Sequence, residues 1–366
     1  MAQDAPTPHT PWPRAVLVGV LVSLVGTLLI LAFLWPSKTS TAHHLPVSVA
    51  GPAASVTALK DAVSQASPDT FTFIDANDRA DAEHQVKTRE SYGAIVLSAP
   101  PAAPEVLTAP AGSAVATQML TGVAATLQTQ LTAQAQAAGL PADQLAKLKV
   151  TVTPVVPLSS TDPTGSGLSA AAFPLTLGGM IGGVMITLLV AGPVRRLAAL
   201  AGLGVAAGLL FTLVLQTWFD YLQGDFLINA LAMGLSVIAT SAFVVGCAAL
   251  IGTPGIGIGA VVTVLVANPL SAAAAPWQFI AAPWGAIGQF LVPGASNWLI
   301  RSLSYFPEAN NTQQWLTLAG WLALGVLLTV AGHFRAKGSL KSAAPEPAPD
   351  SDQPAEHAHA GAHAAA

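Results

Sequence analysis

The chain has 366 residues, of which 52% are hydrophobic and only 9% charged, and its formal net charge is −4. An ordinary soluble domain has roughly 25% charged residues, so this composition excludes a soluble globular protein. We expect an integral membrane protein, with the lipid bilayer and no nucleic acid among its partners.

Six apolar segments are predicted to cross the membrane as helices, since each approaches the ~20 residues that span a bilayer. They are residues 15–35, 169–192, 197–217, 226–251, 255–275 and 315–334. Asn268 and Pro269 interrupt the fifth segment, and proline breaks or kinks a helix interior. We expect that helix to stop or bend there, with the freed backbone groups facing protein or a water-filled cavity.

The first segment has two interpretations, a membrane anchor and a cleaved secretory signal. Residues 15–35 form a longer apolar run than the ~7 to 15 residues of a signal peptide, and no small-x-small cleavage site follows them. We favour an uncleaved anchor that follows a cytoplasmic N-terminus of residues 1–14.

Basic residues near the ends of the predicted spans indicate the orientation. Arg14, Arg195, Arg196 and Arg335 all lie on one side of a six-span arrangement, and the positive-inside rule makes that side cytoplasmic. We expect both termini in the cytoplasm of a multi-pass plasma-membrane protein. The composition of residues 335–366 predicts a disordered tail.

Residues 36–168 have the pattern of a separate domain. Strand-like runs such as "LPVSVAG", "TFTFID" and "YGAIVLS" alternate with helix-like runs, which is typical of βαβ units on a mainly parallel sheet. The predicted fold class is a polytopic α-helical membrane protein with six spans, one before and five after an α/β extracytoplasmic domain inserted between spans 1 and 2.

Two features of this domain have alternative interpretations. One group of four residues has side chains of the types that bind metal ions: Asp75, Asp78, Glu83 and His84. We favour instead that Asp75 or Asn77 caps the following helix and that the other charges are solvated, so no metal or cofactor site is predicted. The long stretch 114–138 has an apolar stripe that packs on its own sheet or on a second copy of the protein. Packing on its own sheet is the simpler expectation.

Three segments carry a resemblance to a known family. "LPVSVAGP", "YGAIVLS" and "FLVPGASNWLIRSLSYF", in an order of one span, a large external domain and five spans, resemble the YhgE/Pip-like membrane proteins of the ABC type-2 exporter permease superfamily. The resemblance implies that residues 276–306 form a re-entrant hairpin of short helices in the outer leaflet. It also implies the transmembrane subunit of an exporter.

Within the hairpin, Pro293, Gly294 and Arg301 are the candidate residues of an outer opening. The chain would turn at Pro283 and Gly285, or at Pro293 and Gly294. Four aromatic residues would anchor the hairpin at the membrane interface, and they are Trp277, Trp284, Trp298 and Tyr305. Arg301 is either functional, as an ionisable group near an intramembrane cavity, or a side chain that snorkels to the headgroups. We favour snorkelling.

The sequence "LGGMIGGVM" predicts close helix packing. It places Gly178 four residues before Gly182 and Gly179 four residues before Gly183, a spacing that lets another helix approach. That helix belongs either to the same chain or to a second copy, so a homodimer is left open.

Function is predicted largely by exclusion. The predicted spans contain no Asp, Glu, Lys or Arg, which disfavours an ion-coupled transporter, and no catalytic residues are predicted. No P-loop motif occurs, so any ATPase must be a separate subunit. Unlike typical exporter permeases, "MAQDAPTPHTPWPR" and "GPVRRLA" offer no coupling helix. We expect a permease-like exporter of an apolar or amphiphilic envelope substrate; the alternative is an envelope scaffold that docks partners through its external domain.

Overall fold

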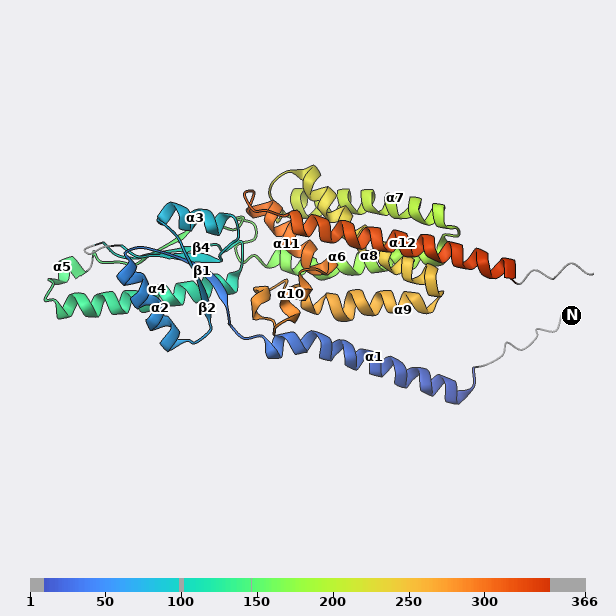
Figure 1. The fold of residues 1–366 in the computed structure, drawn as a ribbon, viewed down its shortest axis with the longest axis horizontal. Helices are drawn as coiled ribbons and strands as arrows, with labels where there is room; N and C mark the ends of the chain where they lie inside the picture. Colours follow the sequence, from blue (N-terminus) through green and yellow to red (C-terminus); the bar gives the residue numbers. More distant parts are fainter. Residues whose placement is uncertain (1–9, 99–101, 146, 343–366) are drawn as a thin grey trace, which may run out of the picture.

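The computed structural model describes residues 10–98, 102–145 and 147–342. A sheet with helices on both faces forms one end of the molecule, and a bundle of long helices forms the other (Figure 1). The first helix, α1 (Trp12–Thr39), lies along the bundle and leads into the first strand of the sheet.

Five helices are long and apolar enough to cross a membrane. Besides α1 they are α6 (Ser166–Leu189), α7 (Pro193–Thr212) with its π-helical continuation η1 (Leu213–Trp218), α8 (Phe226–Ile251) and α12 (Thr312–Ser342). These helices make the chain a multi-pass membrane protein. They cover five of the six predicted spans.

The predicted fifth span is not a full-length helix. Helix α9 (Pro254–Ala260) and its π-helical continuation η2 (Val261–Ala267) have seven residues each, and together they reach at most about 21 Å, less than the ~30 Å of a hydrocarbon core. The chain then forms a short 3₁₀ turn, η3 (Pro269–Ser271), and continues without regular structure to Pro276. The span expected over 255–275 is therefore wrong in length, and its helix stops at Ala267, beside the interruption expected at Asn268 and Pro269.

The other helices of the bundle pack closely around α8. Most of α8 is buried. A Cβ at Gly179 or Gly183 would lie about 2.8–2.9 Å from atoms of α8, while Gly178 and Gly182 face Phe211 and Leu203 of α7. Both glycine pairs of "LGGMIGGVM" thus serve packing within the chain.

Between α1 and α6 the chain forms a five-stranded sheet of order β2-β1-β3-β4-β5. The strands are β1 (Leu45–Ala50), β2 (Phe71–Asp75), β3 (Gly93–Val96), β4 (Glu105–Thr108) and β5 (Thr151–Pro154). Only the β3–β4 pairing is antiparallel, while β1–β2, β1–β3 and β4–β5 are parallel. These strands lie within the strand-like runs that the alternation of strand and helix patterns in the sequence indicates.

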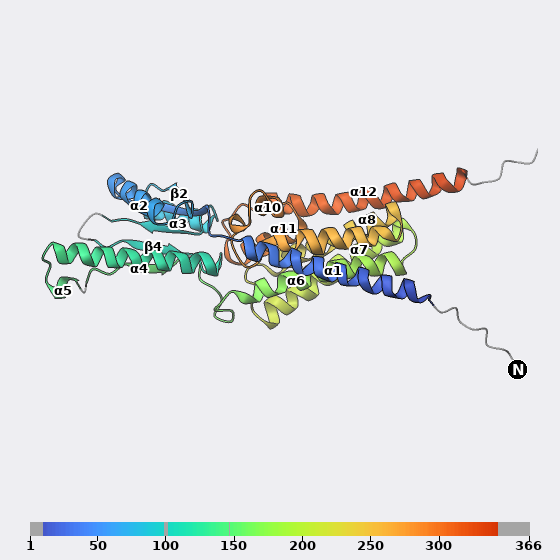
Figure 2. The same cartoon turned by 90° about the horizontal axis from the view of Figure 1, so that it is seen from below.

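Helices cover both faces of the sheet (Figures 1 and 2). They are α2 (Ala53–Ala66), α3 (Arg79–Lys87), α4 (Ala114–Ala137) and the short α5 (Ala142–Leu145). Leu59 of α2 and Leu120 of α4 belong to one hydrophobic core, and Val86 of α3 belongs to the other. The apolar stripe of residues 114–138 therefore packs on its own sheet.

The N-terminus of α3 corrects one expected detail. Asp78, one residue after Asn77, is the N-cap, and its side chain accepts a hydrogen bond from the backbone N–H of Asp81. Asp75 instead pairs with Lys60, with 2.6 Å between Oδ1 and Nζ. Among the described residues, no three His, Cys, Asp or Glu side chains are grouped to hold a metal ion.

Candidate functional site

The segment 276–306 lies where the bundle meets the sheet domain (Figure 1). It contains a 3₁₀ turn, η4 (Trp277–Phe279), and the helices α10 (Trp284–Gly288) and α11 (Val292–Tyr305). The chain turns before α10 and again at 289–291. Pro293 and Gly294 therefore begin α11 and do not form the turn expected there. Gly294 abuts the carbonyl oxygen of Gly288, which leaves no room for a Cβ.

Two phenylalanines of this segment complete the cores of the sheet domain. Phe279 is 4% exposed and packs into the core beneath α2 and α4, whereas Phe306 is 2% exposed and packs into the core beneath α3. Each face of the sheet thus buries one aromatic ring from the membrane-bundle side of the chain. Hydrophobic packing therefore joins the domain to the bundle, in addition to the covalent connections of the chain.

Arg301 is buried at the same junction, which overturns the expectation that it snorkels to the headgroups. Arg301 is only 7% exposed. Nη1 donates to the carbonyl oxygen of Ala111 in the domain at 2.9 Å, and Nη2 donates to Oγ of Ser169 on α6 at 3.1 Å. The guanidinium therefore links three parts of the chain: the domain, α6 and α11.

A second arginine, Arg89, reaches the same place from the domain. Its guanidinium carbon lies 3.5 Å from the ring centroid of Trp298, and Nη1 donates to the carbonyl oxygen of Trp298 at 3.0 Å and to Oγ of Ser302 at 2.7 Å. A cation stacked on tryptophan is stabilised by the ring quadrupole. Burial, the main cause, lowers the pKa of Arg89 below its usual range.

The backbone of Arg89 is in the left-handed region, with φ of 64°. The residue follows Thr88, the C-cap of α3, a position that glycine usually occupies. A non-glycine residue there costs roughly 1–2 kcal/mol, and such strain is concentrated at functional sites. The left-handed conformation therefore marks Arg89 as a candidate functional residue.

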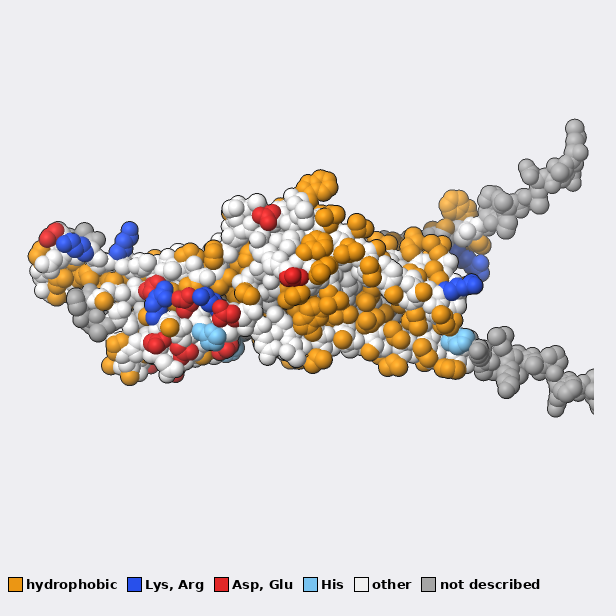
Figure 3. Space-filling model, turned by 90° about the horizontal axis from the view of Figure 1, so that it is seen from above, with side chains coloured by type: hydrophobic (Ala, Val, Ile, Leu, Met, Phe, Trp, Pro, Cys, Tyr) orange, Lys and Arg blue, Asp and Glu red, His pale blue; other side chains and the backbone are white. Residues whose placement is uncertain are grey.

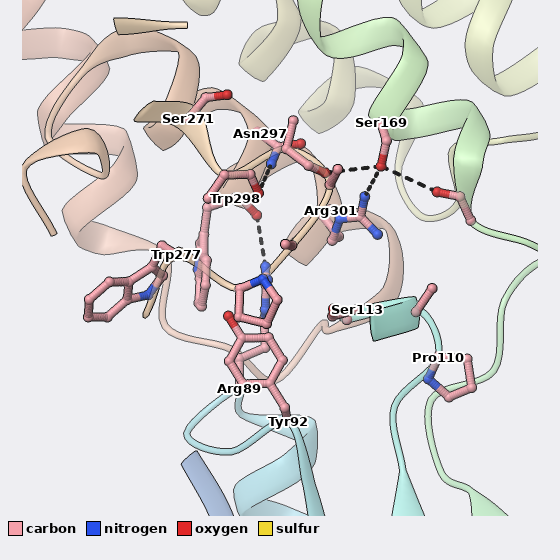
Figure 4. A pocket seen from close by; sticks show the side chains of 18 of the residues that line it. Arg89, Tyr92, Pro110, Ser113, Ser169, Ser271, Trp277, Asn297, Trp298 and Arg301 are labelled. Carbon is pink, nitrogen blue, oxygen red and sulfur yellow. Dashed lines mark hydrogen bonds between the residues drawn. The ribbon is translucent and has the colours of Figure 1, made fainter. Parts of the chain in front are cut away.

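The two arginines border a cavity of about 240 Å³ between the domain and the bundle (Figure 4). Arg89 and Tyr92 approach it from the domain, and Asn297, Trp298 and Arg301 approach it from α11. The other polar residues of the lining are Gln289 and five residues with hydroxyl groups: Ser113, Thr164, Ser166, Ser169 and Ser271. The hydroxyl of Tyr92 lies 3.3 Å from Oε1 of Gln278, and burial raises its pKa to about 12, which keeps it protonated at neutral pH.

No carboxylate forms a direct ion pair with these cations within the described part of the chain. The buried carboxylate of Asp162 acts on Arg301 only as a nearby charge, without contact. The acidic side chain of Asp162 caps α6 instead, because its two oxygens accept the backbone N–H groups of Ser166 and Gly167 at 3.0 and 2.9 Å. The cavity is therefore electropositive.

An apolar groove lies beside this cavity, between α1 and the broken fifth segment. Its volume is about 780 Å³, and Ala32 and Trp35 of α1 line it together with Leu265 and Leu270. Leu270 lines the groove, while its neighbour Ser271 lines the arginine cavity. Only the 3₁₀ turn η3 separates the two spaces at this point.

The sequence singled out Arg301 but missed Arg89 and Tyr92. The available signal was an arginine two residues after the end of α3, at the position where helices commonly end in glycine. Two of the four expected interface anchors, Trp298 and Tyr305, are also placed differently. Trp298 stacks on Arg89, and the hydroxyl of Tyr305 donates to the carbonyl oxygen of Tyr221 at 3.1 Å.

The fold and the cavity define a class of protein: a multi-pass membrane protein whose α/β domain meets its helix bundle at a buried, arginine-lined cavity. A comparison with protein-family models, curated proteins and solved structures finds no match to this chain. The resemblance to YhgE/Pip-like proteins therefore stays an expectation from the sequence.

Proposed function

We propose that this protein is a permease-like membrane subunit that exports an apolar or amphiphilic envelope molecule and binds it where the domain meets the bundle. One observation carries the proposal: a cavity that contains two arginines adjoins an apolar groove, with η3 between them at Leu270 and Ser271. An amphiphile has the matching division into a polar head and an apolar chain.

The dimensions of the two spaces support this division. The groove of about 780 Å³ is within the ~300 to 1,000 Å³ typical of small-molecule sites, and its lining is apolar except for Lys38. The cavity of about 240 Å³ is smaller, so it suits one polar group and not a whole amphiphile. Figure 3 shows the hydrophobic side chains that would face lipid along the bundle, with Lys and Arg gathered at the end remote from the domain.

The proposal predicts that filling the groove stops export. Ala32→Trp places an indole in the groove, and Ala15→Trp places the same ring on an exposed part of α1 outside it. Envelope lipids would be compared, by mass spectrometry, among cells that lack the protein and cells complemented with wild type or either variant. We expect at least one amphiphile whose outer-leaflet amount falls without the protein and returns with wild type and Ala15→Trp, but not with Ala32→Trp. An unchanged lipid inventory in cells without the protein contradicts the export function.

A docking protein is the second candidate function. Helices α6 and α7 are joined by residues 190–192 alone, so no helix lies between them on which a separate ATPase subunit would push. Purification of the full chain in mild detergent distinguishes the candidates. A co-purifying ATPase favours the permease, and a stable complex with another envelope protein through the domain favours docking.

A further inference from the structure

We propose that Arg89 and Arg301 form a binding site for a single phosphate group in the cavity between the domain and the bundle. The inference deepens the proposed function, on which it rests for the idea that an amphiphile enters here. The binding itself is measured without transport, so failure of one proposal is distinguishable from failure of the other.

The first argument is charge. Two guanidinium groups border one cavity, and neither forms a direct ion pair with a carboxylate among the described residues, although the charge of Asp162 acts on Arg301. A buried charge is expensive unless it is paired, and arginine stays protonated in proteins. The hydrogen bonds that they do make, to Ala111, Trp298, Ser169 and Ser302, use neutral oxygens only. An anion in the cavity would supply the missing counter-charge.

The second argument is the number of unused donors. A guanidinium has five N–H groups, and each arginine has two hydrogen bonds to protein oxygens. Nε of both side chains makes no such bond in the described structure. Both arginines therefore retain donors with which to bind an anion, and arginine is the residue that pairs most readily with phosphate.

The third argument is the arrangement of the lining. Ser113 and Ala114 begin the 24-residue helix α4 and line the cavity, and the N-terminus of a long helix attracts anions. Donors thus come from the domain through Arg89, from the N-terminus of α4 and from α11 through Arg301, whereas the hydroxyl of Ser169 already donates to the carbonyl oxygen of Ala273 at 3.0 Å. A tetrahedral phosphate presents its oxygens in several directions and so matches donors from three elements better than a planar carboxylate does.

The test uses the purified full chain in a neutral maltoside detergent and isothermal titration calorimetry. Inorganic phosphate and dihexanoyl phosphatidic acid are the two probes, and dihexanoylglycerol, which lacks phosphate, is the control ligand. Saturable binding of both probes indicates a site open to free phosphate. Saturable binding of phosphatidic acid alone assigns the site to a lipid headgroup. Binding of neither probe, or equal binding of dihexanoylglycerol, overturns the proposal.

The discriminating variant is Asn297→Asp. Asn297 lies one turn before Arg301 on α11 and lines the same cavity, so aspartate adds the missing carboxylate at nearly unchanged side-chain size. We expect phosphate binding to weaken about tenfold or more, while the melting temperature without ligand rises. The matched control is Asn310→Asp, an exposed residue outside the cavity whose Oδ1 accepts the backbone N–H of Thr312 at the start of α12. This change should leave phosphate binding unchanged, even if the added charge stabilises the helix N-terminus.

A second variant keeps the proposal testable if Asn297→Asp does not fold. Arg89→Gln removes one cation but keeps an amide that can still donate to the carbonyl oxygen of Trp298. It should weaken binding of the phosphate probe by about tenfold in protein that elutes as wild type on gel filtration. Undiminished binding in folded Arg89→Gln or in folded Asn297→Asp overturns the assignment.

Discussion

At the scale of single residues, charged side chains in this protein have two different roles. On the domain surface they pair: Glu105 of β4 receives two hydrogen bonds from Arg79, at 2.7 and 3.1 Å, and a third from Thr153 at 2.7 Å. At the junction, Arg89 and Arg301 form no direct ion pair in the described chain. The contrast is consistent with the proposed anion site, for which unpaired guanidinium groups are required.

The Glu105 cluster gives a prediction about stability and pH. Hydrogen bonding from Arg79, the largest cause, lowers the pKa of Glu105, so its carboxylate stabilises the folded domain above the ordinary glutamate pKa. Glu105→Gln should lower the free energy of unfolding by about 1–2 kcal/mol at pH 7. The loss should shrink as pH falls through the lowered pKa, because wild-type Glu105 then becomes protonated as well.

Thermal unfolding of the full chain between pH 7 and pH 3 would measure this difference. Asp61→Asn is the control, since Asp61 is exposed on α2 and has no ion pair among the described residues. A constant difference between wild type and Glu105→Gln across this pH range would rule out the carboxylate as the cause.

At the scale of secondary-structure elements, the short helices of 276–306 have a structural role that is not evident from their sequence. Phe306 directly follows α11 and Phe279 ends η4, and each fills one core of the sheet domain. In an isolated domain both cores would lack an aromatic ring. Residues 38–165 alone should therefore be less stable than the same domain in the full chain, although its sheet is complete.

Phe306→Ala tests this coupling directly. Removing a fully buried phenylalanine typically costs about 3–5 kcal/mol, and here the cavity would open beneath α3 in the domain while the mutated residue belongs to the bundle. We expect the domain of the variant to lose protection from hydrogen exchange in β3 and α3 while the long helices keep theirs. Phe290→Ala, at a residue 58% exposed, should leave both regions protected. Equal protection in the two variants would show that the domain does not depend on the ring.

At the scale of the whole molecule, the sequence predicts what depends on local pattern and misses what depends on contacts between distant segments. Long apolar runs and strand–helix alternation follow from hydropathy and periodicity, and five long helices and the strands lie where these patterns indicate. The burial of Arg301 could not be predicted, because its partners Ala111 and Ser169 are more than 130 residues away in sequence. The same holds for Arg89, whose stacking partner belongs to α11.

The shortened fifth helix raises the question of whether that segment crosses the membrane. Helix α9 with η2 covers about 21 Å, and residues 272–276, which have no regular structure, add up to about 16 Å. Together they exceed the ~30 Å hydrocarbon core. Irregular backbone is tolerated at membrane depth where protein buries it or where it lines a cavity, and residues 272–276 line the arginine cavity. We therefore expect a crossing that returns the chain to the side of the domain.

Cysteine labelling of intact cells would decide the crossing, in a Cys247→Ala background that removes the single native thiol. Lys87→Cys reports on the domain, Asn310→Cys on the chain just before α12, and Val194→Cys, at a residue 77% exposed, on the opposite end of the bundle. With the domain outside, as the positive-inside rule predicts, an impermeant maleimide should label positions 87 and 310 on intact cells and position 194 only after permeabilisation. Labelling at 87 without labelling at 310 would mean that the fifth segment does not cross. It would also separate the start of α12 from the domain, and that is incompatible with the packing of Phe306 into the core of the sheet.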